Sequence, residues 1–87
     1  MVSFEILWKR STEHDLRKLP QKQVNRILKA VEPLNKNPFP TGCRKLRDSE
    51  SFYRIRVGDY RVVYNIDKKR KMITIYYIRH RKDAYRS

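Results

Sequence analysis

The sequence is poor in the residues that build most metal sites, disulfides and membrane anchors. Its 87 residues include one cysteine, two histidines and two glycines, so an intramolecular disulfide and a glycine-rich phosphate loop are both excluded. The spacing of Cys43, His14 and His80 matches no metal-binding motif. No apolar run approaches the length of a membrane span, and the N-terminus lacks the apolar core of a signal peptide. These absences predict a cytoplasmic protein that works without a metal or another cofactor.

Acidic residues are scarce relative to basic ones. The chain carries 22 lysines and arginines against 9 aspartates and glutamates, which gives a formal charge of +13. Most of these cations cannot be neutralised within the chain, so we expect the protein to bind nucleic acid or an acidic protein partner. The length predicts one small domain that spans residues 1–87.

An arginine-rich β-hairpin is the clearest local feature of the sequence. Apolar and polar residues alternate from Phe52 to Tyr64, on both sides of a turn signal at residues 58–59. A two-residue turn there places Arg56 opposite Arg61. Because successive strand residues point to opposite faces, the hairpin should have one apolar face and one cationic face. Three arginines share the cationic face: Arg54, Arg56 and Arg61.

The segment before the hairpin predicts one strand, two helices and a loop. Residues 2–8 alternate as a strand, and Ser11 or Thr12 could cap a short helix that ends near residue 19. Apolar residues recur with helical spacing over residues 24–34, and the polar face of this second helix, which includes Arg26, is expected to be solvated. The long stretch over residues 37–51 lacks periodicity and predicts a loop.

After the hairpin, residues 72–78 predict a third strand of an antiparallel meander, with Ile73, Ile75 and Tyr77 on its apolar face. A polar tail follows. The resulting fold class is α+β: an N-terminal strand, two helices and a three-stranded antiparallel meander, with both helices packed on one face of the sheet. This arrangement leaves the arginine face open to solvent.

The open arginine face suits RNA cleavage without a metal. When a 2′-hydroxyl attacks the neighbouring phosphate, arginines can stabilise the charge that develops on the phosphoryl oxygens. Arginine keeps its proton at all pH values up to about 12, so it is a poor acid or base. A tyrosine or a histidine is the better proton shuttle.

The chain resembles the RelE branch of the RelE/ParE toxin superfamily over essentially its whole length. Four stretches carry the resemblance in this order: SFEILW, NPFPTGCRKLR, YRIRVGDYRVVY and IRHRKDAY. The resemblance implies a microbial-RNase-like fold and an endoribonuclease that enters the ribosomal A site and cuts translated messenger RNA. It also implies a cognate antitoxin, with the free toxin a monomer and the complex a hetero-oligomer.

By position, the resemblance assigns catalytic roles to residues of the hairpin and of the C-terminal motif. Arg54 and Arg56 correspond to the two basic strand residues of the family, and Arg61 to its phosphate-binding arginine. Arg81 corresponds to the transition-state stabiliser or acid, and Tyr85 to the base-stacking tyrosine.

The chain departs from the family at one chemical point. The best-studied RelE-type enzymes carry lysines where this chain has Arg54 and Arg56, and a lysine can serve as general base where arginine hardly can. His80 is a candidate replacement, although it could equally be a packing residue at the end of a strand. Further cations are expected to bind RNA: Arg44, Lys45, Arg47, Arg79 and Lys82.

Two other functions remain open from the sequence. One is a ParE-like inhibitor of DNA gyrase without nuclease activity. The other is a non-catalytic cationic module whose RNA binding would weaken steeply with salt.

Overall fold

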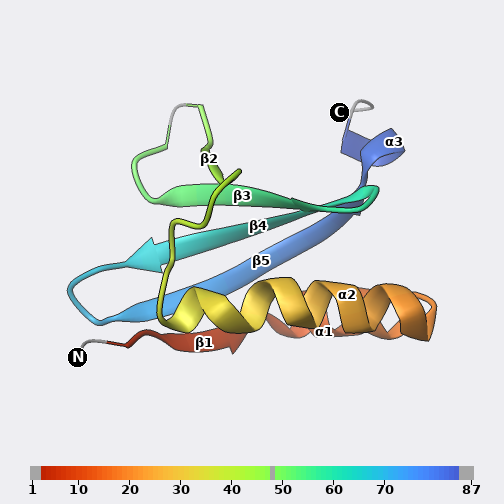
Figure 1. Cartoon of the computed structure of the whole chain (residues 1–87), viewed down its shortest axis with the longest axis horizontal. Helices are drawn as coiled ribbons and strands as arrows, with labels where there is room; N and C mark the ends of the chain where they lie inside the picture. The colour runs from red at the N-terminus through yellow and green to blue at the C-terminus, as the bar shows by residue number, and fades with distance from the viewer. Residues whose placement is uncertain (1–2, 48, 85–87) are drawn as a thin grey trace.

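Two helices cover one face of a five-stranded sheet in the computed structural model of the protein, which describes residues 3–47 and 49–84 (Figure 1). The elements along the chain are β1 (Glu5–Trp8), α1 (Arg10–Arg17), α2 (Gln21–Val31), the 3₁₀ helix η1 (Glu32–Asn35), β2 (Arg44–Lys45), β3 (Phe52–Val57), β4 (Tyr60–Asp67), β5 (Met72–His80) and α3 (Arg81–Ala84). The predicted α+β fold with its antiparallel meander is confirmed. Within the described part of the chain, no helix is long and apolar enough to cross a membrane.

The strand order across the sheet is β1, β5, β4, β3 and β2. β1 runs parallel to β5, and all other neighbours are antiparallel. The prediction of a continuous loop over residues 37–51 is wrong at β2, where Arg44 pairs with Arg54 and Lys45 with Tyr53. Two residues are too few to show the alternation that predicts a strand. Pairing with β3 is what gives this segment its extended conformation.

Thr12 is buried and bonded to the sheet, and it does not cap α1. The helix begins one residue after Lys9, so the prediction that Ser11 or Thr12 caps it is wrong. The Thr12 hydroxyl donates to the backbone carbonyls of Ile75 and Tyr76 on β5. This contact attaches α1 to the middle of the sheet.

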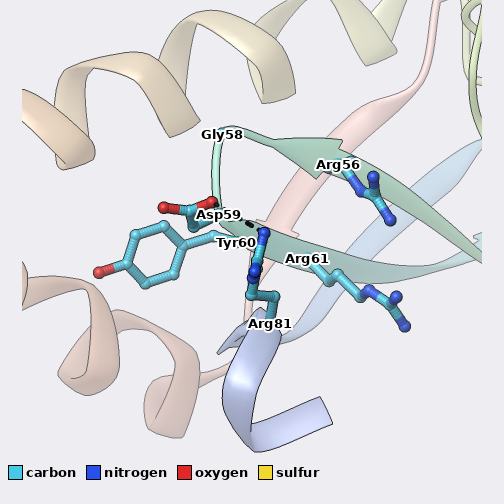
Figure 2. A pocket seen from close by; sticks show the side chains of 6 residues that line it. All are labelled: Arg56, Gly58, Asp59, Tyr60, Arg61 and Arg81. Carbon is cyan, nitrogen blue, oxygen red and sulfur yellow. Dashed lines mark ion pairs between the residues drawn. The ribbon is translucent and has the colours of Figure 1, made fainter. Parts of the chain in front are cut away.

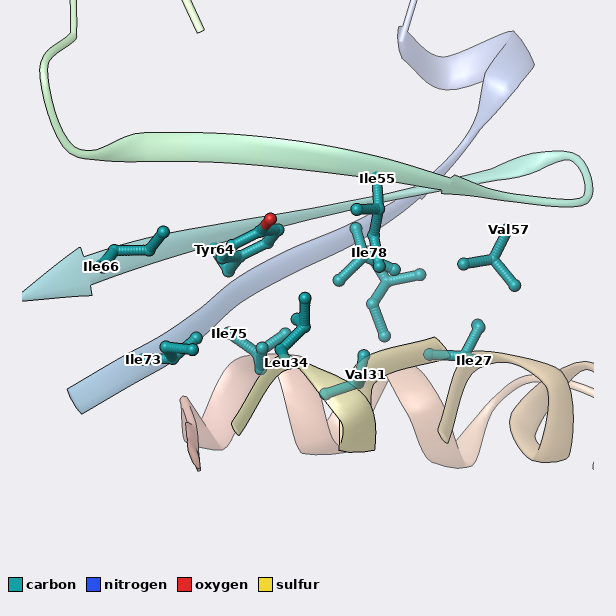
Figure 3. Packing of buried hydrophobic residues seen from close by; sticks show 11 residues of the cluster. Ile27, Val31, Leu34, Ile55, Val57, Tyr64, Ile66, Ile73, Ile75 and Ile78 are labelled. Atoms are coloured by element: carbon teal, nitrogen blue, oxygen red, sulfur yellow. The ribbon is translucent and has the colours of Figure 1, made fainter. Parts of the chain in front are cut away.

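α2 supplies the helical side of the core (Figure 3). The predicted periodicity is confirmed, because Ile27 and Val31 of α2 and Leu34 of η1 are at most 1% exposed. They pack against the apolar face of the sheet, which consists of Ile55, Val57, Val62, Tyr64, Ile66, Ile73, Ile75 and Ile78. Burial of one large aliphatic side chain contributes about 1.5–3 kcal/mol, so this layer fixes which face of the sheet is covered.

The β3–β4 hairpin has the predicted register. Arg56 is directly opposite Arg61 around a two-residue turn. Gly58 in that turn has a φ of 61°, the left-handed conformation that favours glycine. Arg54 joins the other two arginines on the face that the helices leave uncovered, because strand residues alternate between faces.

A β-bulge in β5 exchanges the faces of its last residues. Two neighbouring residues of β4, Tyr64 and Val63, pair with Ile75 and Tyr77 of β5. Tyr76 has no partner in this register and is therefore the extra residue of the bulge. The prediction that Tyr77 lies on the apolar face is therefore wrong. Ile78 occupies that core position and is 8% exposed.

Tyr64 holds the loop before β2 against the sheet. Its side chain is fully buried, and its hydroxyl donates to the carbonyl of Pro38 at 2.8 Å. The ring of Tyr53 stacks beside it, with the ring centres 6.2 Å apart. Burial raises the pKa of the Tyr64 phenol above its ordinary value, and the neighbouring Cys43 adds to this shift.

Candidate active site

A pocket of about 360 Å³ opens at the turn of the β3–β4 hairpin, beside the start of α3 (Figure 2). Its guanidinium groups come from three elements, since Arg56 lies on β3, Arg61 on β4 and Arg81 at the start of α3. We call this site the arginine pocket. Its lining residues are Arg56, Gly58, Asp59, Tyr60, Arg61 and Arg81.

Two contacts fix Arg81 beside the hairpin turn. Its backbone N–H donates to the carbonyl of Asp59 at 2.7 Å, and its Nη1 lies 3.9 Å from Asp59 Oδ1 (Figure 2). The two side chains are 67% and 66% exposed, so both are open to solvent and an anion can reach Arg81. The pairing is therefore an exposed one, which typically stabilises a protein by at most about 1 kcal/mol.

Arginines form a row across three strands at this end of the sheet. Arg56 is opposite Arg61, and Arg61 is opposite Arg79 on β5. The Nε atom of Arg61 is buried, whereas Arg56 is exposed. The guanidinium of Arg79 lies 4.7 Å from the centre of the Tyr77 ring. Like charges in register repel one another, so the row favours the binding of an anion.

A second cationic pocket adjoins the first. It has a volume of about 520 Å³ and is lined by Gly42, Arg44, Arg54 and Arg56. Arg44 lies opposite Arg54 on the edge strand β2. Arg56 lines both pockets, so the two form a continuous cationic surface along β3.

The other predicted RNA-binding cations lie around this surface. Lys45 is exposed on β2 and pairs with Tyr53, so it faces the opposite side of the sheet from Arg44. Arg47 is exposed just after β2, and Lys82 is exposed in α3. Their roles stay predictions.

His80 lies on the opposite face of the sheet from the arginine row. It pairs with Tyr60, and the two rings meet edge to face with their centres 5.2 Å apart. Its Nδ1 accepts a hydrogen bond from the backbone N–H of Lys82 at 3.2 Å. It lines a separate pocket of about 300 Å³ with residues that include Asp15 of α1. The structure thus does not bring His80 into the arginine pocket. Tyr85 lies outside the described residues.

Asp59 and Arg26 contribute to the site in ways that the sequence analysis missed. The sequence pattern identifies Asp59 only as a turn residue. Its position between the arginines of β3 and β4 is a signal that could have placed it in the site. Arg26 of α2 reaches across to the same turn. A Cβ atom placed on Gly58 would lie 3.1 Å from Nη1 of Arg26. No local sequence signal reveals that contact, because it joins a helix to a distant turn.

Comparison with known proteins places the chain among small bacterial and archaeal toxins. The family model described as ParE toxin of type II toxin-antitoxin system, parDE, matches residues 6–85. Toxin RelE of Mycobacterium tuberculosis is 38% identical over 73 residues, which cover 83% of this chain and 75% of that protein.

Solved structures agree with this placement. A chain of the archaeal RelE-RelB complex from Pyrococcus horikoshii superposes with a TM-score of 0.82 at 28% identity, covering 91% of this chain and 96% of that one. A chain of the toxin-antitoxin complex RelBE2 from Mycobacterium tuberculosis gives a TM-score of 0.78 at 25% identity, covering 91% and 99%.

Fold and family match together define a toxin of a type II toxin–antitoxin system. The chain belongs to the ParE toxin family and is a RelE-type member of the RelE/ParE superfamily, as the resemblance in its sequence predicted.

Proposed function

We propose that the protein is an endoribonuclease that cuts translated messenger RNA in the ribosomal A site and is neutralised by a cognate antitoxin. The observation that carries this proposal is the arginine pocket. Arg56, Arg61 and Arg81 line one cavity at the end of the uncovered sheet face, although they come from three separate elements. Such a constellation suits a phosphate whose negative charge increases during a reaction.

In the proposed reaction the 2′-hydroxyl of RNA attacks the adjacent phosphate without help from a metal. Arg56 and Arg61 stabilise the charge on the non-bridging oxygens, and their position on two paired strands limits the reorganisation that this requires. Arg81 reaches the same phosphate from the start of α3. Removal of one such donor typically lowers a rate by about 10²–10³-fold.

The surrounding cations are proposed to hold the RNA on either side of the cut. Arg44 and Arg54 line the adjoining pocket and are suited to bind a neighbouring phosphate. The exposed cations around this surface add attraction for messenger RNA and for ribosomal RNA of the A site. Tyr85 is proposed to stack on a base, as the family resemblance implies.

Primer extension on translating ribosomes tests the proposal. The purified protein should produce new cuts within codons in the A site, and Arg61→Ala should cut about 10²–10³-fold more slowly. Arg70→Ala is the matched control, because Arg70 is an exposed arginine that pairs with Asp67 outside the pocket. Folded protein that leaves translated messages intact would contradict the proposal, as would unaltered cutting by Arg61→Ala.

The antitoxin is proposed to cover part of the basic surface with an acidic or amphipathic segment. Two observations support this: the formal charge of +13, and the similarity to chains solved in RelE-RelB and RelBE2 complexes. Affinity for the product of the adjacent reading frame should fall as salt is raised from about 0.05 to 0.5 M, because salt screens exposed charges. An affinity that is independent of salt would contradict the electrostatic part of the proposal.

A second candidate is inhibition of DNA gyrase, which the description of the matching family model as a ParE toxin favours. A gyrase supercoiling assay separates the two functions. An inhibitor of gyrase should block supercoiling while it leaves messages on the ribosome intact. The endoribonuclease should show the reverse pattern.

A further inference from the structure

Among the described residues that line the arginine pocket, Asp59 is the one whose side chain is suited to accept a proton from a substrate at neutral pH. We propose that the Asp59 carboxylate is the general base that deprotonates the attacking 2′-hydroxyl. This inference rests on the proposed nuclease function and supplies the step for which the arginines are unsuited. Asp59 is the sole carboxylate among the described residues that line the pocket.

The other lining groups do not fit this role. Guanidinium groups keep their protons at any physiological pH, which removes Arg56, Arg61 and Arg81. A phenol is also protonated at neutral pH, which removes Tyr60. The Asp59 carboxylate points to the same side of the turn as the Tyr60 ring and contacts Arg81 there (Figure 2). His80 lines a different pocket on the other face of the sheet. A carboxylate, by contrast, is ionised at neutral pH and is ready to accept a proton.

The position of Asp59 is built by the fold. The left-handed φ of Gly58 shapes the turn, and the guanidinium of Arg26 lies against it. The Asp59 carbonyl accepts the Arg81 backbone N–H at 2.7 Å, and its carboxylate lies 3.9 Å from Arg81 Nη1. Arg81 can therefore bind the scissile phosphate next to the carboxylate. Because the Asp59 side chain is 66% exposed, a ribose hydroxyl can reach it.

The proposed step balances as follows. The 2′-hydroxyl gives its proton to a carboxylate oxygen of Asp59 while the 2′-oxygen forms a bond to phosphorus. The bond from phosphorus to the 5′-oxygen breaks on the opposite side, and the leaving oxygen takes a proton from solvent water. The products are a 2′,3′-cyclic phosphate and a 5′-hydroxyl, and Asp59 returns its proton to solvent. No electron is exchanged with an oxidant or a reductant.

Three variants test the role by single-turnover cleavage of messenger RNA on programmed ribosomes. Asp59→Asn keeps an oxygen that can contact Arg81 but removes the base, so the cleavage rate should fall about 10²–10⁴-fold while ribosome affinity does not weaken. Asp59→Glu restores a carboxylate and should recover part of the loss. Asp67→Asn is the matched control, because Asp67 also pairs with an exposed arginine at 3.9 Å, and it should cut at the wild-type rate.

Chemical rescue separates a base from a residue that merely positions Arg81. Asp59→Ala should regain activity with added formate, and more with acetate, at constant ionic strength, because acetate is the stronger base. Circular dichroism and thermal melting verify that each variant is folded.

These experiments distinguish a wrong assignment of Asp59 from a wrong proposal of nuclease activity. Wild-type protein that does not cut overturns both ideas. Wild-type protein that cuts, together with Asp59→Asn at a similar rate, overturns only the assignment of Asp59. The assignment is also overturned if Asp59→Asn is slow but added carboxylates do not rescue Asp59→Ala. Rescue must be greater with acetate than with formate to support a base.

Discussion

Arg56 and Arg61 face each other directly across the β3–β4 hairpin, and Arg79 continues the same row on β5. Like charges directly opposite one another destabilise a sheet. We therefore expect the pair to lower the stability of the free protein, and an anion bound between the two arginines to relieve the repulsion. This relationship is typical of a binding site whose charges are arranged for a ligand.

Replacement of one arginine of the pair should affect stability and activity in opposite directions. Arg56→Gln should raise the free energy of unfolding by about 0.2–1 kcal/mol, because it removes the cross-strand repulsion. The same variant should cut messenger RNA more slowly, since it loses a phosphate ligand. Urea denaturation and primer extension measure the two effects. The control Arg70→Gln should neither gain stability nor lose cleavage, and a stability loss in Arg56→Gln would contradict the repulsion.

Gly58→Ala should be destabilising through two separate causes. A residue with a Cβ in the left-handed conformation costs about 1–2 kcal/mol, and the new methyl group would lie 3.1 Å from Arg26 Nη1. Gly42→Ala isolates the backbone cost of a positive φ, here 91°, because a Cβ at that position meets nothing within 4 Å. Thermal denaturation gives the loss for each variant. The double variant Gly58→Ala/Arg26→Ala should recover the stability that is lost through the contact with Arg26. It should keep the loss that comes from the left-handed backbone.

Thr12→Val should lower the free energy of unfolding by about 1–3 kcal/mol. The side chain keeps its shape but loses the hydroxyl that donates to the carbonyls of Ile75 and Tyr76. Urea denaturation gives the value, and Ser11→Ala, at an exposed position of the same helix, should change it little. A neutral Thr12→Val variant would show that the carbonyls at the bulge find other partners.

Tyr64→Phe should reveal the buried phenol through the pH dependence of stability. At neutral pH the variant should be less stable by about 1–3 kcal/mol, because the Pro38 carbonyl loses its donor. The folded protein raises the pKa of Tyr64, so only the unfolded chain gives up this proton above about pH 10. Wild-type stability that depends on Tyr64 is thus complete below pH 10 and declines above it.

The stability difference between wild type and Tyr64→Phe should consequently narrow by about 1.4 kcal/mol per pH unit above pH 10. Urea denaturation of both proteins between pH 7 and 11 provides the measurement. Tyr77→Phe serves as control, because Tyr77 is only partly buried and lies on the open face. A constant difference across this range would contradict the shift.

Local patterns in the sequence determined the hairpin and therefore the centre of the site. Alternation and a two-residue turn fix the β3–β4 register without any information about the rest of the chain. Arg54, Arg56 and Arg61 share a face for that reason alone. The helical periodicity of α2 likewise identified Ile27, Val31 and Leu34 as core residues, because one face of an amphipathic helix must be buried.

Only the tertiary structure decided which residues complete the site. One extra residue in β5, Tyr76, exchanges the faces of the strand end, so Arg79 joins Arg61 and His80 turns toward the helices. The carbonyls at this bulge bond to Thr12, 63 and 64 positions away in the chain, and no local pattern encodes such a contact. The same limit applies to the approach of Arg81 to Asp59 and of Arg26 to Gly58, because these contacts depend on how separate elements pack.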